Sequence, residues 1–177
     1  EKISFKKLVK NLSAISVREE SAEKMVSGLT DMPVNVTLDP TLLTEAADWE
    51  KAAARIIHPK KYILVYEVSV FPETETAARA LSAKTGLPIV RILYNRTKLK
   101  YGYKTLADLG PAEFLGWIKN AEYVVTSSFH GTALSILFEK EFYTVPHRSY
   151  PTRMTDLLSK LELSERVIFT LPEKIEV

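Results

Sequence analysis

Two spacings of apolar residues alternate along this chain, and together they predict its strands and helices. Unbroken apolar runs predict buried strands, most clearly at residues 62–66, 88–94 and 123–126 and more weakly at residues 14–17, 34–38 and 142–145. Apolar residues that recur every three or four positions predict helices at residues 5–12, 19–29, 45–57, 73–84, 111–120, 132–138 and 153–161. The polar residues 95–109 predict an irregular loop, and residues 167–169 predict a final extended piece.

Strands and helices follow one another with short connections over the whole chain. This order is typical of a parallel sheet with helices on both faces, because a crossover helix joins each pair of parallel strands. No internal repeat, low-complexity tract or obvious linker interrupts the order. We therefore expect an α/β fold in which residues 1–177 form a single Rossmann-like domain.

The composition narrows the class of protein. A hydrophobic fraction of 46% and a charged fraction of 26% are ordinary for a globular domain, and 177 residues can build a full core. The net charge of +2 is too small to indicate a nucleic-acid surface. The sequence contains no cysteine and no apolar run long enough to span a bilayer. We therefore expect neither a nucleic-acid partner nor a transmembrane segment.

One turn carries most of the candidate chemistry, at Ser127-Ser128-Phe129-His130-Gly131-Thr132. It lies between a predicted buried strand and a predicted helix. The backbone N–H groups and the dipole at a helix N-terminus favour a negatively charged ligand. His130 adds a group that can donate a proton. The turn therefore predicts a site for an acidic or phosphorylated ligand.

Basic side chains follow several of the other predicted strands. Ligands of open parallel sheets bind beyond the carboxyl ends of the strands. If all the strands belong to one parallel sheet, its rim also holds guanidinium groups, which suit carboxylate and phosphate oxygens. The rim residues would then be Arg18, Arg96, His130, His147, Arg148 and Arg153.

Each candidate also has a structural interpretation. His130 could cap its helix, Arg18 could pair with an adjacent glutamate, and Arg148 could lie in a solvated loop. Arg153 could be an ordinary surface charge on its helix. The sequence lacks the G-x-G-x-x-G, P-loop and G-x-S-x-G motifs. Its three histidines lack metal-ligand spacing, so we expect no metal site.

Taken together, the motifs resemble the polysaccharide pyruvyl transferase family over nearly the whole chain. The similar segments keep the family's order and spacing, and they are SVREES at residues 16–21, DPTLL at residues 39–43, SFHGT at residues 128–132, and Arg153 before Leu157-Leu158. Each block alone is a weak signal, whereas the set is fairly specific.

The resemblance implies a GT-B-like enzyme with two Rossmann-like domains and an active site in the cleft between them. It further implies that residues 1–177 are the C-terminal domain, with the N-terminal domain as a missing partner. Family members transfer a pyruvyl group from phosphoenolpyruvate to two hydroxyls of a sugar. The expected partners are thus phosphoenolpyruvate and a saccharide or lipid-linked oligosaccharide acceptor. We expect no cofactor, and we expect a cytoplasmic location in which the inner face of the membrane is a candidate place.

The resemblance also assigns roles to residues. It makes His130 the catalytic histidine and Arg18 the arginine that holds phosphoenolpyruvate. We expect Arg153 to contribute a donor contact and Arg148 to be a further candidate. Asp39 and Glu113 match family segments in which structural roles are expected. The full set expected to bind phosphoenolpyruvate is Arg18, Ser127, Ser128, Gly131, Thr132, Arg153 and, as the further candidate, Arg148.

Two other functions remain open at this point. The chain could be a GT-B glycosyltransferase domain that uses a nucleotide-sugar, or a non-catalytic α/β domain that binds a glycan or a protein partner. The choice of ligand discriminates between the first of these and pyruvyl transfer, because only one donor contains a nucleotide. A non-catalytic domain would bind no small anion at residues 127–132.

Overall fold

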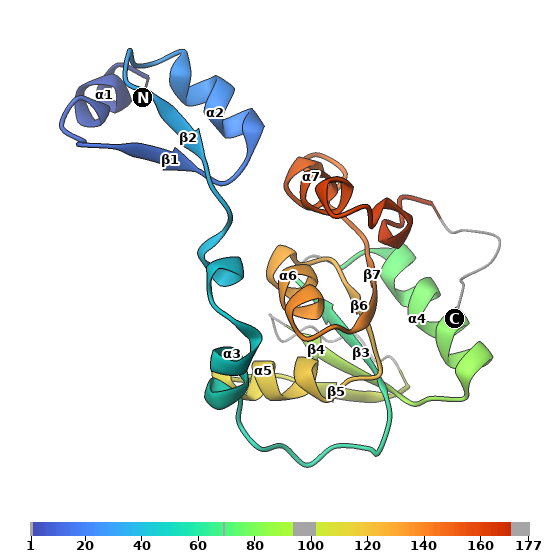
Figure 1. Cartoon of the computed structure of the whole chain (residues 1–177). Coiled ribbons are helices and arrows are strands. Elements are labelled where there is room, and N and C mark those ends of the chain that lie inside the picture. The colour runs from blue at the N-terminus through green and yellow to red at the C-terminus, as the bar shows by residue number, and fades with distance from the viewer. Residues whose placement is uncertain (1, 69, 94–101, 171–177) are drawn as a thin grey trace. The chain divides into compact units, whose positions relative to one another are not determined.

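The computed structural model describes residues 2–68, 70–93 and 102–170. These residues form two compact units, Glu1–Leu43 and Thr44–Val177 (Figure 1). The five-stranded Rossmann-like sheet lies entirely in the second unit.

The first unit is built around one parallel pair of strands. Its elements are α1 (Lys2–Val9), β1 (Ile15–Val17), α2 (Glu20–Ser27), β2 (Val34–Val36) and the 3-10 turn η1 (Pro40–Leu43). The two strands pair with Ile15 opposite Val34, and α2 is the crossover between them. Val9 and Ile15 are buried, whereas several other large apolar side chains of this unit are exposed.

The second unit contains a five-stranded parallel sheet in the order β5-β4-β3-β6-β7. Its strands are β3 (Ile63–Glu67), β4 (Ile89–Leu93), β5 (Lys104–Leu106), β6 (Tyr123–Thr126) and β7 (Glu141–Thr144). Its helices are α3 (Ala46–Ala52), α4 (Pro72–Thr85), α5 (Pro111–Lys119), α6 (Phe129–Leu137) and α7 (Thr152–Lys160), followed by the 3-10 turn η2 (Ser164–Arg166).

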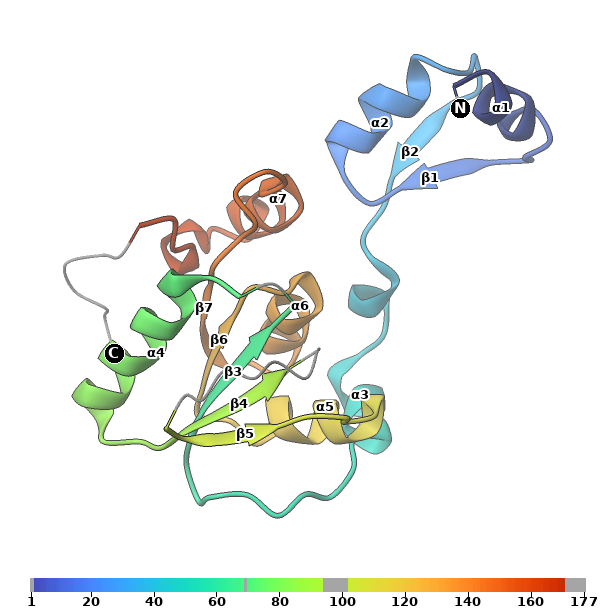
Figure 2. The same ribbon diagram turned by 180° about the vertical axis from the view of Figure 1, so that it is seen from behind.

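Helices cover both faces of this sheet, as the sequence predicts (Figures 1 and 2). One core lies under α4, where Ala77, Ala78 and Leu81 pack on Ile63 and Val65. The opposite core lies under α5 and α6 and includes their apolar residues Leu115, Ile118 and Leu134. Because both faces are covered, the central strands β3 and β6 are almost continuous apolar runs.

Most of the predicted elements are confirmed, but four details differ. The strand β5 lies within residues 95–109, where we expected only an irregular loop. The helix expected at residues 45–57 ends at Ala52, and a non-helical segment follows it. Residues 167–169 contribute one bridge, between Val167 and Thr144, and no strand. The first two strands pair with each other and take no part in the five-stranded sheet. Within the described residues, no helix is both long and apolar enough to cross a membrane.

Candidate active site

The expected junction between strand and helix is present, but the helix begins three residues earlier than expected, so that residues 129–132 form its first turn. β6 ends at Thr126, and α6 begins at Phe129 with Ser128 as its N-cap. The Ser128 hydroxyl accepts a hydrogen bond from the backbone N–H of Gly131 at 3.3 Å, which satisfies one donor that the helix itself cannot use. The first turn of α6 thus starts at the carboxyl edge of the sheet, where ligands of such folds bind.

Hydroxyl groups below the turn hold its backbone in place. The Thr126 hydroxyl donates to the carbonyl oxygen of Tyr66 at 2.7 Å and accepts from the N–H of Ser128 at 3.1 Å. The Thr132 hydroxyl contacts that of Thr144 at 2.7 Å and donates to the carbonyl oxygen of Ser128 at 3.1 Å. Ser128 and Thr132 therefore use their hydroxyls inside the protein, a structural role that the sequence did not indicate.

Gly131 is required by a close approach in the same turn. A Cβ atom added to Gly131 would lie 2.3 Å from Oγ1 of Thr126 and 3.2 Å from its Cγ2. Ordinary contacts of a Cβ atom lie at 3.4–4 Å. The absence of a side chain at Gly131 thus allows α6 to begin directly against the end of β6.

Two side chains of the turn face outward, and both are aromatic. Phe129 is half-buried and His130 is exposed, and their ring centroids lie 5.6 Å apart with the rings nearly perpendicular. Arg153, from the first turn of α7, places its guanidinium carbon 3.7 Å from the centroid of the Phe129 ring. This cation–π contact holds the Arg153 guanidinium against Phe129, the residue directly before His130.

The structure therefore brings two of the predicted site residues, His130 and Arg153, into contact with the same ring, that of Phe129. The sequence did not identify Phe129, although it lies within the SFHGT block. Its sequence position next to His130 was the only available signal, because Arg153, whose guanidinium stacks on it, lies 24 residues further along the chain. A positive charge and the N-terminus of α6 coincide here, and this combination favours an anion.

Arg148 and His147 follow β7 at the same edge of the sheet. Arg148 is exposed, and its guanidinium forms an ion pair with Glu73 in the first turn of α4. Glu73 accepts from its own backbone N–H and from Arg148, and both hydrogen bonds lower the pKa of its carboxyl group. His147 packs its ring on Tyr150 at 5.6 Å. Arg148 is thus a rim cation whose charge is already balanced by Glu73.

Arg18 lies in the first unit, and its contacts differ from those that its neighbours in sequence suggest. Its Nη1 atom donates to Oδ2 of Asp39 at 2.6 Å, and not to either adjacent glutamate. The Asp39 side chain is 3% exposed and that of Arg18 is 49% exposed. Asp39 also accepts from the N–H of Thr41 at 3.0 Å, which confirms its expected role in shaping the loop.

The expectation of a single shared rim needs correction for Arg18. Arg18 follows β1, and β1 belongs to the two-stranded sheet, so Arg18 is not on the rim of the five-stranded sheet. The physical reason is that the backbone of β1 pairs with that of β2 in parallel, and with no strand of the five-stranded sheet. Arg96 lies outside the described residues.

Glu67 ends β3 at the rim, but it belongs to a buried ionic cluster. Its carboxylate pairs with the fully buried guanidinium of Arg91 on β4 and accepts from the N–H of Phe71 at 3.3 Å. The same guanidinium also binds Glu75 and the hydroxyl of Tyr103. Burial raises the pKa of Glu67, and Arg91 opposes that rise. These contacts give Glu67 a structural role. Across the described part of the chain, no group of three or more His, Cys, Asp or Glu side chains could hold a metal ion.

Comparison with known proteins adds a family and a fold. A family model described as polysaccharide pyruvyl transferase matches residues 1–149. Among solved structures, the chain is similar to UDP-GlcNAc 2-epimerase of Methanocaldococcus jannaschii, in complex with UDP-GlcNAc and UDP. The TM-score is 0.55 and the sequence identity is 14%, and the match covers 87% of this chain and 53% of that chain. The chain thus spans about half the length of the epimerase. No curated protein matches the sequence.

Proposed function

The chain belongs to the polysaccharide pyruvyl transferase family, and from that premise we propose that it transfers a pyruvyl group from phosphoenolpyruvate to two hydroxyls of a saccharide. The observation that carries this proposal is the exposed His130 beside the Phe129–Arg153 stack at the N-terminus of α6. Phosphoenolpyruvate bears a carboxylate and a phosphate, and both charges suit a guanidinium and a helix N-terminus. The donor would bind with one of these anionic groups over the turn.

The proposed reaction needs one proton and two hydroxyl groups. A proton is added to the methylene carbon of phosphoenolpyruvate, and positive charge develops on the carbon that bears the phosphate. One sugar hydroxyl bonds to that carbon and loses its proton. The second hydroxyl then forms the other C–O bond as the bond between that carbon and the phosphate oxygen breaks, and its proton passes to the departing phosphate. The products are a cyclic ketal and inorganic phosphate.

His130 has two suitable roles in this scheme. It can be the general acid that protonates the methylene carbon, or it can stabilise the departing phosphate as a cation. Its exposure and its position at the helix start suit either role, because both need contact with the donor. Arg153 would bind the donor beside it. Ser127, Ser128, Gly131 and Thr132 would form the floor of the site, and any direct contact would come from their backbone.

The remaining residues are assigned to donor binding in the same proposal. Arg18 is proposed as a donor-binding residue on the strength of the family resemblance, and within its own unit its half-exposed guanidinium is held by Asp39. Arg148 would join only if the donor displaced Glu73 from its ion pair. We propose a saccharide or a lipid-linked oligosaccharide as acceptor, no cofactor, and a cytoplasmic site of action near the inner face of the membrane.

The histidine provides the decisive test. We expect His130→Ala to reduce phosphate release from phosphoenolpyruvate by a hundredfold or more, on the order of what a positioned acid contributes. His130→Gln is the matched variant, because it keeps a polar side chain at the helix start but cannot act as an acid. Because His130 is exposed, neither variant should change the urea unfolding midpoint. Near-normal phosphate release by both variants, in the enzyme with its N-terminal domain, would contradict the assignment.

A ligand comparison separates this proposal from the two alternatives. The similar epimerase was solved with UDP-GlcNAc and UDP, so a nucleotide-sugar is the natural competitor. We expect phosphoenolpyruvate, and not UDP-GlcNAc, to raise the melting temperature of the chain, and Arg153→Gln to remove that rise. Stabilisation by UDP-GlcNAc alone would favour a glycosyltransferase-like function. No stabilisation by either ligand would favour a binding domain.

A further inference from the structure

A concave site lies one strand away from the His130 turn. It has a volume of about 310 Å³ and is lined by Tyr66, Ile92, Leu93, Asp108, Leu109, Gly110, Pro111 and Phe114. Tyr66 comes from the carboxyl end of β3, Ile92 and Leu93 come from that of β4, and Phe114 comes from the first turn of α5. Of these residues, only Tyr66 contributes to the turn described above, through its backbone carbonyl oxygen. The volume is near the lower end for ligand pockets, which suits a single ring.

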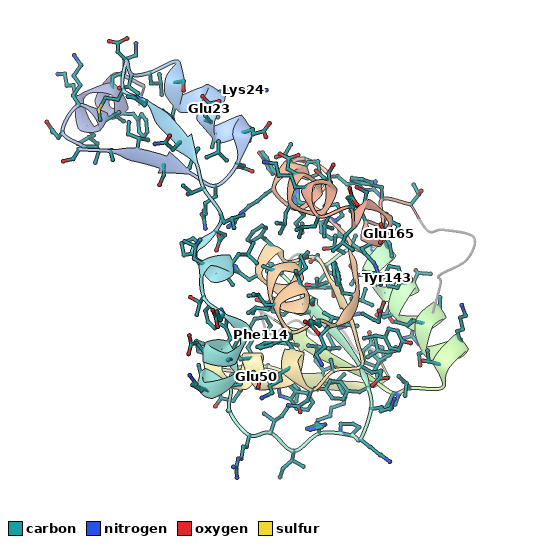
Figure 3. The ribbon with its side chains drawn as sticks, in the orientation of Figure 1. Glu23, Lys24, Glu50, Phe114, Tyr143 and Glu165 are labelled. Atoms are coloured by element: carbon teal, nitrogen blue, oxygen red, sulfur yellow. The ribbon has the colours of Figure 1, made fainter. Side chains whose placement is uncertain are left out.

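Aromatic rings form one wall of this pocket. The rings of Tyr66 and Phe114 lie 4.4 Å apart between centroids and are tilted by 52°, and both are half-buried (Phe114 is labelled in Figure 3). Their partial exposure leaves ring surface available to a ligand. An aromatic face binds the apolar C–H face of a pyranose, because that face is flat and carries little charge.

One acidic residue, Asp108, is part of the same lining. Asp108 has a φ of 59°, a left-handed backbone conformation that non-glycine residues seldom adopt. Nearby, the Glu113 carboxylate folds back to the start of α5, so that a Cβ atom on Gly110 would lie 2.7 Å from its Oε2. Carboxylates accept hydrogen bonds from hydroxyl groups strongly, and they repel phosphate. The charge of this pocket therefore disfavours the donor and suits a neutral polyhydroxyl ring.

The pocket is also connected to the turn through the sheet. Tyr66 is the register partner of Thr126, and its carbonyl oxygen accepts the Thr126 hydroxyl at 2.7 Å. Neighbouring strands lie about 4.8 Å apart, which is close to the width of one pyranose ring. Both α5 and α6 cover the same face of the sheet and begin at the same edge. A ring bound in the pocket would therefore lie next to the His130 turn.

From these observations we infer that the pocket formed by Tyr66, Asp108 and Phe114 is the subsite for the acceptor, and that it binds one pyranose ring of a neutral saccharide. This inference rests on the proposed function for the identity of the acceptor, whereas the binding of a pyranose follows from the pocket itself. The ring stacks on Phe114, and its hydroxyls donate hydrogen bonds to Asp108. The donor then occupies the adjacent turn, and both ligands bind together.

Ligand-detected saturation-transfer NMR on the 177-residue chain can test this subsite with methyl pyranosides of glucose, galactose, mannose and N-acetylglucosamine as probes. We expect at least one pyranoside to bind, and Phe114→Leu to weaken its binding by about 2- to 10-fold through loss of the aromatic face. Phe114→Tyr is the matched control and should retain binding. Asp108→Asn, which tolerates the left-handed backbone, should weaken binding to a similar extent. The urea unfolding midpoint of each variant shows whether the fold is intact.

Competition experiments complete the test. Phosphoenolpyruvate should leave the pyranoside signal in place, because the two sites are separate. Binding of no pyranoside, or equal binding by wild type, Phe114→Leu and Asp108→Asn, would overturn the inference, as would displacement of the pyranoside by phosphoenolpyruvate. Binding of uridine monophosphate in place of any pyranoside would overturn it too. If His130 variants release phosphate normally while Phe114-dependent pyranoside binding persists, pyruvyl transfer fails and the saccharide pocket stands.

Discussion

Replacing Gly131 by alanine would force a methyl group into the end of β6. The new Cβ atom would lie 2.3 Å from Oγ1 of Thr126, so the two atoms must separate by about 1 Å to reach an ordinary contact. The Thr126 hydroxyl cannot move that far and keep its bonds to Tyr66 and Ser128, at 2.7 and 3.1 Å. The substitution therefore couples a steric clash to the loss of two hydrogen bonds.

The expected cost follows from these contacts. Two buried hydrogen bonds contribute about 1 kcal/mol each, and overpacking a core costs about 1–3 kcal/mol. The higher helix propensity of alanine returns up to about 1 kcal/mol. We therefore expect Gly131→Ala to lower the free energy of unfolding by about 2–4 kcal/mol.

Urea unfolding followed by tryptophan fluorescence measures this cost, because both tryptophans of the chain, Trp49 and Trp117, lie in the second unit. Gly86→Ala is the contrasting variant. Its φ is 73° and its added Cβ atom would meet nothing within 4 Å, so backbone strain alone should cost about 1–2 kcal/mol.

A double mutant isolates the clash itself. Thr126→Ala removes Oγ1, the atom that the new methyl group meets most closely, and leaves the Cβ atom of residue 126 at 3.1 Å, so adding Gly131→Ala to that background should cost only about 1 kcal/mol. The coupling energy between the two sites would then be about 2 kcal/mol. Additive costs for Gly131 and Thr126, or coupling of equal size between Gly86 and Thr126, would refute the argument from close approach.

Two further predictions concern stability. The Tyr62 hydroxyl is buried and donates to the carbonyl oxygen of Trp117 at 2.6 Å, so Tyr62→Phe should lower the free energy of unfolding by about 1–2 kcal/mol in urea titrations, and an unchanged midpoint would contradict this. The hydrogen bonds of Glu73 to its own N–H and to Arg148 lower its pKa, so their contribution is present at neutral pH and is lost as the pH falls below about 4.3 through the lowered pKa. Glu73→Gln should therefore be less stable than wild type at pH 7, and the difference should shrink as the pH falls through the lowered pKa of Glu73. A difference independent of pH would exclude the ion pair as its cause.

Local patterns in the sequence predicted much of the fold because strands such as 62–66 and helices such as 73–84 depend on short-range spacing. The strand β5 was missed because its three residues, Lys104–Leu106, are exposed or half-buried at an edge and lack an apolar run. The separate pairing of β1 and β2 was missed for another reason. Apolar runs identify strands, but they do not specify which strands pair.

In the candidate site, too, the features that depend on nearby residues were predicted, whereas the contacts between residues distant in sequence were not. The turn with His130 follows from the adjoining strand and helix signals, which lie within a few residues of it. The partners of the arginines do not, because Asp39 lies 21 residues from Arg18 and Glu73 lies 75 residues from Arg148. The fully buried Arg91 likewise reads as an ordinary strand position until Glu67 and Tyr103 converge on it.

The β6–α6 turn combines buried structural positions with outward-facing ones, and this has a consequence for how such proteins diverge. Thr126, Ser128, Gly131 and Thr132 are buried and fixed by the backbone that they support, so their replacement costs stability before it changes chemistry. Only the two outward positions, held by Phe129 and His130, can vary with little effect on folding. Evolution of a new activity on this scaffold would therefore begin at those two positions. The buried hydroxyl and glycine residues would be retained in related proteins, even in those that catalyse a different reaction.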